Sequence, residues 1–103
     1  MGKYVKTLQN VIVGGVRYSV GEKYLLCTAT IARDGVLFDP KAKIKRLYYP
    51  SGKAFLIVTD GQMTAGRKVE LVTEKQARQF MDAHPEGINE KVYIKYFGKP
   101  AEL

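Results

Sequence analysis

The spacing of apolar residues along the chain changes once, near residue 73. Before that point apolar and polar side chains mostly alternate, as they do between Val16 and Val20. A period of two is typical of half-buried β-strands. After residue 73 apolar residues recur every three or four positions, which is the period of an amphipathic helix. We therefore expect a β-rich part over residues 1–72 and a helical part over residues 73–103.

Turn residues divide the β-rich part into five to seven short strands. The pair Gly21-Glu22 fits a two-residue hairpin turn between a strand that ends at Val20 and a strand over residues 23–31. Alternation places four apolar residues of the latter on one face: Leu25, Cys27, Ala29 and Ile31. Three dipeptides mark further turns: Gly14-Gly15, Asp34-Gly35 and Asp60-Gly61.

The clearest hairpin surrounds residues 49–52. Pro50 presets the backbone of a type I turn, and Gly52 is suited to the left-handed position that follows. The flanking strands are expected over residues 43–49 and 53–59. Because residues 54–58 are all apolar, the second of these strands should be covered on both faces. One more strand is expected over residues 67–72, with Val69 and Leu71 pointing inward.

The helical part begins with a capping box, in which Thr73 and Gln76 satisfy each other's free backbone amides. The apolar stripe of this helix consists of Ala77, Phe80, Met81 and His84, and Pro85 ends it. The tail has two interpretations. Its apolar residues alternate as in a strand, whereas Asn89 is a good N-cap and Gly98 a good helix end, so we favour a helix over residues 90–97.

This order of elements predicts an α+β fold in a single domain, residues 1–103. A small antiparallel sheet should be followed by one or two C-terminal helices. Such a twisted sheet either curls into a partly closed, SH3-like barrel with helices over one opening, or stays open with a helix across it.

The composition is that of a globular protein, with 103 residues of which 46% are hydrophobic. A single cysteine excludes an internal disulfide and favours a reducing compartment. The N-terminus lacks the apolar core of a signal peptide, and no apolar run approaches the roughly 20 residues that span a bilayer. We expect a soluble, cytoplasmic protein.

Positive charge is concentrated in the first two-thirds of the chain. The formal net charge is +7, and residues 1–68 contain 12 of the 17 Lys and Arg but only 4 of the 10 Asp and Glu. A field of this sign attracts polyanions such as nucleic acids. The excess is densest at residues 41–46, directly before the turn at residues 49–52.

Catalytic and metal-binding patterns are weak. Cys27 and His84 are the only residues of their kinds, and Cys27 falls on an apolar face, where a thiol behaves as a small hydrophobic group. Two potential ligands are too few for a structural zinc site, which takes about four. The sequence also lacks the Gly-rich motifs that bind phosphates. We expect a protein that is not an enzyme and that has neither a metal nor a cofactor.

Binding to a nucleic acid or a nucleoprotein complex is the function that the basic segment favours. Its cations are suited to track phosphates, and a neighbouring tyrosine offers a ring for base stacking. The expected contact residues are Lys41, Lys43, Lys45, Arg46, Tyr48, Lys53, Arg67 and Lys68. In one alternative these lysines lie on a solvent-exposed edge strand and only prevent aggregation. In another they contact an acidic protein surface.

The second half of the chain contains three local motifs. They are a hairpin with Leu47-Tyr48 before the turn, Gly52 in it and Phe55-Leu56 after it, a capped helix from Thr73 to Phe80, and a tail from Tyr93 to Gly98. Together these motifs resemble a class of small uncharacterised proteins from phages and bacterial mobile elements. The resemblance implies such an origin and a helical tail, but no activity. Since small phage proteins often block host machinery, it adds one alternative, an inhibitor or assembly factor that binds a host protein without contacting nucleic acid.

Overall fold

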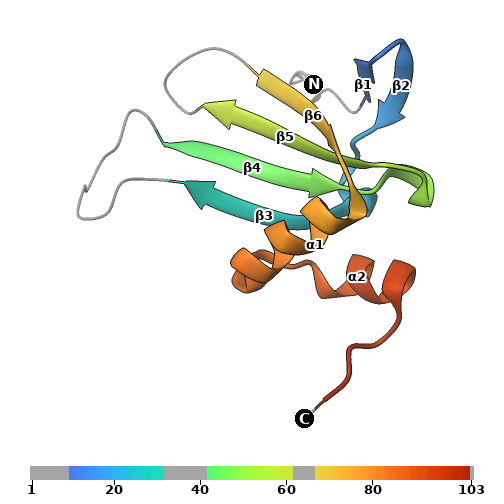
Figure 1. Ribbon diagram of the computed structural model, residues 1–103, viewed down its shortest axis with the longest axis vertical. Helices are drawn as coiled ribbons and strands as arrows, with labels where there is room; N and C mark the ends of the chain where they lie inside the picture. The colour runs from blue at the N-terminus through green and yellow to red at the C-terminus, as the bar shows by residue number, and fades with distance from the viewer. Residues whose placement is uncertain (1–9, 32–41, 62–66, 103) are drawn as a thin grey trace, which may run out of the picture.

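The computed structural model describes residues 10–31, 42–61 and 67–102 (Figure 1). These residues form a two-stranded antiparallel sheet, a four-stranded antiparallel sheet and two C-terminal α-helices. The predicted α+β class, with an antiparallel sheet followed by helices, is confirmed. The sheets do not close into a barrel. Instead, the two-stranded sheet packs over one face of the larger sheet, which gives a partly closed arrangement.

The two-stranded sheet is a hairpin of β1, Asn10–Val13, and β2, Val16–Ser19. The turn between them is Gly14-Gly15, as predicted. Both glycines have positive φ angles, 59° and 80°, which residues with a β-carbon rarely adopt. A hairpin turn of this kind matches the twist of its flanking strands.

The hairpin turn predicted at Gly21-Glu22 is wrong. Gly21 has an extended backbone with a φ of −71°, and Glu22–Tyr24 form a 3₁₀ turn. The amide of Tyr24 donates to the carbonyl oxygen of Gly21 at 2.9 Å. The chain therefore changes sheet here, because β2 pairs back with β1 while the next strand pairs elsewhere.

The larger sheet has the strand order β3-β4-β5-β6. Its strands are β3, Leu25–Ile31; β4, Lys43–Tyr48; β5, Phe55–Gly61; and β6, Arg67–Val72. The turn at residues 49–52 forms as predicted, with Gly52 at a φ of 66°. Asp60-Gly61, predicted as a turn, instead ends β5, because both residues pair with β4. The turn predicted at Asp34-Gly35 lies outside the described residues.

A β-bulge interrupts the alternation of β3. Leu25 pairs with Tyr48 and Cys27 pairs with Leu47, so Leu26 has no partner on β4. Leu25 therefore does not share the face of Cys27, contrary to the prediction. The bulge brings Leu26 into the core, where it is fully buried.

Helix α1, Glu74–Ala83, begins at the predicted capping box. The amide of Gln76 donates to the Thr73 hydroxyl at 3.1 Å, and the amide of Thr73 donates to the Gln76 side chain at 2.9 Å. Helix α2, Glu90–Phe97, confirms the helical interpretation of the tail. Neither of these helices, which are the two α-helices of the described ranges, is long and apolar enough to cross a bilayer.

Two apolar clusters lie on opposite faces of the larger sheet. The helix-side face packs against α1 and α2, and its cluster includes Leu47, Phe55, Ala77, Met81 and Val92. The hairpin-side face packs against β1 and β2, and its cluster consists of Val11, Val20, Leu56 and Val58. Strand β5 contributes to both clusters, so its predicted coverage on both faces is confirmed. Leu71, expected to point inward, is 47% exposed on the edge strand β6.

Candidate nucleic-acid interface

Strands β3, β4 and β5 extend beyond the helices at one end, on the left in Figure 1, and β6 begins beside the end of β5. We call this the free end of the sheet. It consists of residues 29–31, 43–46, 59–61 and 67–68, which are the end of β3, the start of β4, the end of β5 and the start of β6. Five of the eight predicted contact residues lie here: Lys43, Lys45, Arg46, Arg67 and Lys68.

Three lysines share the helix-side face of the free end. Alternation along β4 puts Lys43 and Lys45 on the face of the buried Leu47. Thr59 of β5 pairs with Lys45 on one side and with Lys68 of β6 on the other. Lys45 and Lys68 are thus two strands apart, about 10 Å between backbones. We call Lys43, Lys45 and Lys68 the lysine patch.

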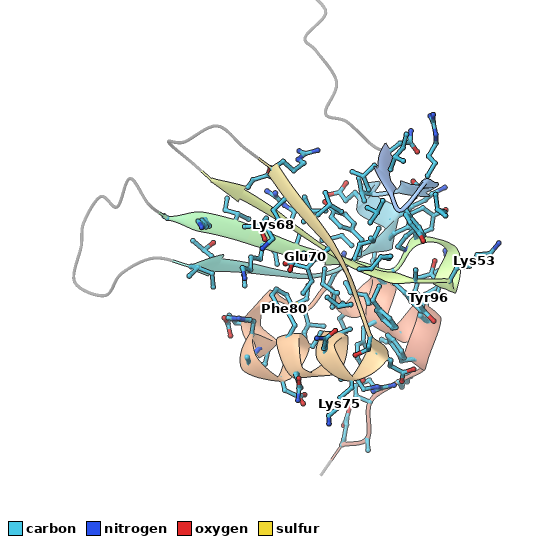
Figure 2. All side chains as sticks on the ribbon, turned by 45° about the horizontal axis from the view of Figure 1, so that its top comes forward. Lys53, Lys68, Glu70, Lys75, Phe80 and Tyr96 are labelled. Carbon is cyan, nitrogen blue, oxygen red and sulfur yellow. The ribbon has the colours of Figure 1, made fainter. Side chains whose placement is uncertain are left out.

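Nearby carboxylates offset little of the positive charge of the lysine patch. Within the described part of the chain, neither Lys43 nor Lys45 forms an ion pair or a side-chain hydrogen bond. The Lys68 Nζ atom lies 3.7 Å from the Glu70 Oε2 atom, and the Lys68 side chain is 72% exposed (Figure 2). An ion pair this long and exposed contributes little stability.

The edge-strand explanation for these lysines is wrong for β4. That strand pairs with β3 along one side and with β5 along the other, so it is internal. Lysines that prevent strand-to-strand aggregation act on edge strands, which in this sheet are β3 and β6. Lys43 and Lys45 are therefore not needed for that purpose.

The two arginines of the free end lie on the opposite, hairpin-side face. Arg67 donates to Asp60 at 3.0 Å, and Arg46 donates to the other carboxylate oxygen at 3.4 Å. All three side chains are about one-third exposed or less. One carboxylate thus offsets part of the charge of two guanidinium groups. This arrangement was not predictable from the sequence, because Asp60-Gly61 has the composition of a turn.

Neither tyrosine of the basic segment extends the lysine patch. Tyr48 is half-buried on the hairpin-side face, against the cluster of Val11 and Leu56. Burial raises its pKa above the usual value of 10.0, although Arg46 opposes that effect. Tyr49 stacks on Phe55 with ring centroids 4.1 Å apart, within an aromatic cluster that holds α2.

The remaining predicted contact residues are not brought to the free end. Lys53 follows the turn between β4 and β5 and lies at the opposite end of these strands from Lys68 (Figure 2). Lys41 lies outside the described residues. The seven predicted residues that the structure describes thus separate into the lysine patch, the two paired arginines with Tyr48 on the other face, and the distant Lys53.

Cys27 and His84 meet in the structure, but through the wrong atoms for a nucleophile and its base. The Cys27 thiol donates to the backbone carbonyl oxygen of His84, 3.4 Å away. The His84 ring instead packs against Phe80, with centroids 5.0 Å apart. Cys27 is fully buried, and burial raises its pKa to about 11. A reactive cysteine needs the opposite change in pKa.

No group of three or more His, Cys, Asp or Glu side chains in the described ranges is placed to hold a metal ion. Comparison with known proteins found no matching family model, no significantly similar curated protein and no significantly similar solved structure.

Proposed function

We propose that the protein is a small, non-enzymatic binding protein that contacts a nucleic acid or a nucleoprotein complex through the lysine patch. One observation carries the proposal. Lys43 and Lys45 lie on an internal strand, beyond the helices, without a partner among the described residues.

Electrostatics supports this proposal. Lys43 and Lys45 lie two positions apart on β4 and Lys68 lies two strands from Lys45, so three like charges repel one another on one sheet face. Phosphate groups bound across the patch would remove this repulsion and release counterions, which is the main source of nonspecific affinity for nucleic acids. The patch consists of lysines, which bind phosphates as point charges, so we expect affinity with little sequence preference.

The two arginines have a secondary role in this proposal. Arg46 and Arg67 both donate to Asp60 on the other face. Their main role is therefore to stabilise the pairing of β4, β5 and β6. The buried thiol of Cys27 supports the non-enzymatic part of the proposal. An origin in phages or mobile elements is also proposed, and it rests only on the hairpin, capped-helix and tail motifs.

The test is fluorescence anisotropy with labelled single-stranded and duplex DNA and RNA, at several salt concentrations between about 50 and 200 mM. The wild type is compared with Lys43→Gln/Lys45→Gln and with Lys75→Gln/Lys91→Gln. Lys75 and Lys91 are exposed on the two helices, so the control loses the same charge far from the patch. Figure 2 shows Lys75 on the outer side of α1.

We expect the patch variant to lose affinity and the control to lose much less. For single strands, the slope of log affinity against log salt should become shallower by about 0.7 for each lost phosphate contact. Equal losses in both variants would reduce the effect to net charge and refute the patch. If no labelled nucleic acid binds at low salt, the proposal fails, and the lysines are better explained by an acidic protein partner.

A further inference from the structure

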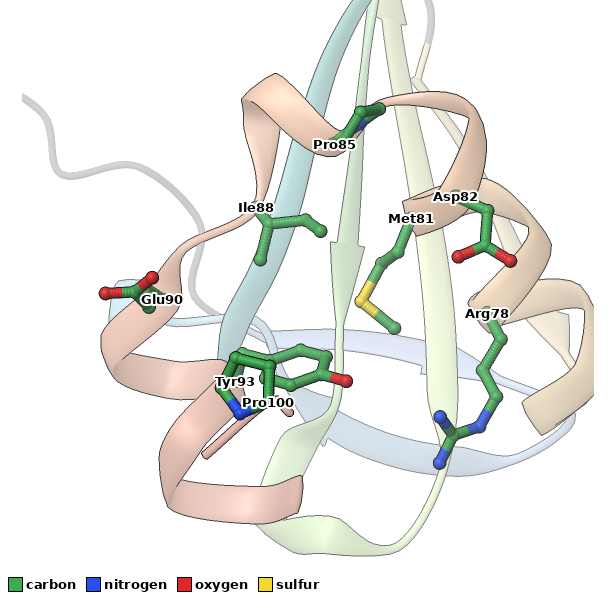
Figure 3. A pocket seen from close by; sticks show the side chains of 8 residues that line it. All are labelled: Arg78, Met81, Asp82, Pro85, Ile88, Glu90, Tyr93 and Pro100. Carbon is green, nitrogen blue, oxygen red and sulfur yellow. The ribbon is translucent and has the colours of Figure 1, made fainter. Parts of the chain in front are cut away.

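A pocket of about 360 Å³ lies between the two helices (Figure 3). None of the residues that line it belongs to the lysine patch. The walls of the pocket are α1, the 3₁₀ turn Pro85–Gly87 that follows it, the first half of α2, and Pro100 beyond the end of α2. This volume is at the lower end of the range of small-molecule sites, about 300–1,000 Å³. The pocket is therefore large enough for a compact ligand.

Part of the pocket lining is apolar. Met81, which is buried, and Ile88 point into it from opposite sides, and the ring of Tyr93 forms part of its wall (Figure 3). The Tyr93 hydroxyl points across the pocket from α2 toward α1. This part of the lining suits an apolar body, and charged side chains form the rest of it.

The charges at the rim do not cancel. Arg78 lines the pocket, but it donates to Glu74 at 2.9 Å and lies over the ring of Phe97, 4.9 Å from its centroid. The hydrogen bond to Glu74 also raises the pKa of Arg78, so the guanidinium group stays charged and bound to Glu74. Asp82 and Glu90 line the same pocket without an ion pair among the described residues. The pocket is thus negative in a chain whose net charge is +7.

The end of α1 adds to this negative potential. Its last turn contains Asp82 and no basic residue, although the carbonyl end of a helix favours cations. Glu86 follows on the turn Pro85–Gly87, and it too has no ion pair within the described ranges. Asp82 and Glu86 are therefore unfavourable for α1 alone, and a bound cation would relieve their repulsion.

From this combination we infer that the pocket between α1 and α2 binds a small organic cation, an ammonium or guanidinium group on a compact apolar body. The apolar body contacts Met81, Ile88 and the Tyr93 ring. The cationic head lies at the rim beside Asp82, whose carboxylate faces the space between Met81 and Arg78 (Figure 3). This site does not depend on nucleic-acid binding, and each can fail without the other.

The probes are benzylammonium, the neutral benzyl alcohol and the anionic benzoate, which share one apolar ring. Each is titrated into the whole protein labelled at the methyl groups of Ile and Met, and chemical shifts are followed by nuclear magnetic resonance. We expect saturable shifts at Ile88 and Met81 with benzylammonium, weaker ones with benzyl alcohol and none with benzoate. Equal affinity for the cation and the alcohol, or no saturable shift with the cation, overturns the proposal.

Asp82→Asn is compared with Glu22→Gln, which removes one exposed carboxylate from the turn before β3. We expect Asp82→Asn to weaken benzylammonium binding by about 3- to 5-fold, as for a partly exposed ion pair. The alcohol should bind this variant as it binds the wild type. The same small loss in both variants would assign the effect to net charge and overturn the role of Asp82.

Discussion

Gly87 lies directly against the backbone of Thr28. A β-carbon at position 87 would overlap the Thr28 carbonyl oxygen and lie 2.9 Å from its carbonyl carbon. The contact belongs to a junction between β3 and the segment before α2, in which the amide of Asn89 donates to the carbonyl oxygen of Leu26 at 2.7 Å. An isolated bridge between Cys27 and Ile88 completes it. This junction joins the helical part to one edge of the sheet.

Replacing Gly87 with Ala should therefore destabilise the fold. The added methyl group meets rigid backbone, so β3 and α2 must separate, at a cost of about 1–3 kcal/mol as for other overpacked sites. Urea unfolding followed by circular dichroism measures this loss. Gly21→Ala is the control, because the nearest atom to its β-carbon is 3.8 Å away and its φ of −71° suits any residue. Equal stability of the two variants would contradict the contact.

The Cys27 thiol should make stability depend on alkaline pH. Burial raises its pKa from 9.0 to about 11, so between these values the unfolded chain releases the proton while the folded chain keeps it. Stability is then full below pH 9 and falls as the pH rises. Between pH 9 and about 11, the unfolding free energy of the wild type should fall relative to that of Cys27→Ala by about 1.4 kcal/mol for each pH unit. A difference that stays constant from pH 8 to 11 would show an unshifted thiol.

The two charged faces of the free end should differ in nucleic-acid binding. Arg46→Gln/Arg67→Gln removes the same charge as Lys43→Gln/Lys45→Gln, but from the hairpin-side face. We expect the arginine variant to bind labelled single strands more tightly than the lysine variant. The arginine variant should also be less stable than the wild type, by up to about 1 kcal/mol, since partly exposed ion pairs contribute little. If the arginine variant binds more weakly, the contact surface is the other face.

The aromatic cluster between α2 and the turn at residues 49–52 should stabilise the packing of α2. Phe97 stacks near Tyr49 and Phe55, at centroid distances of 5.8 and 6.4 Å. Because Phe97 is only half-buried, we expect Phe97→Ala to cost about 2 kcal/mol, less than a fully buried phenylalanine. Thermal unfolding measures the effect. Ile12→Ala, at a side chain that is 64% exposed, should stay within about 0.5 kcal/mol of the wild type.

Local signals in the sequence determined the helices and several of the turns. The capping box of Thr73, the positive-φ turn at Gly14-Gly15 and the turn closed by Gly52 involve only neighbouring residues. Their structures follow from the preferences of those residues, and for that reason α1, α2 and most strand limits were predictable. Alternation along β4 likewise places Lys43 and Lys45 on one face and Arg46 on the other.

Only the tertiary structure decided which strands pair and what each face meets. Nothing local to Gly21-Glu22 specifies that β2 pairs with β1 while β3 pairs with β4. The bulge at Leu26 moves Leu25 off the face of Cys27. The strand order makes β4 internal, so its lysines do not protect a sheet edge. Strand pairing is a non-local choice among segments of similar propensity, and it is decided by which arrangement buries both faces of β5.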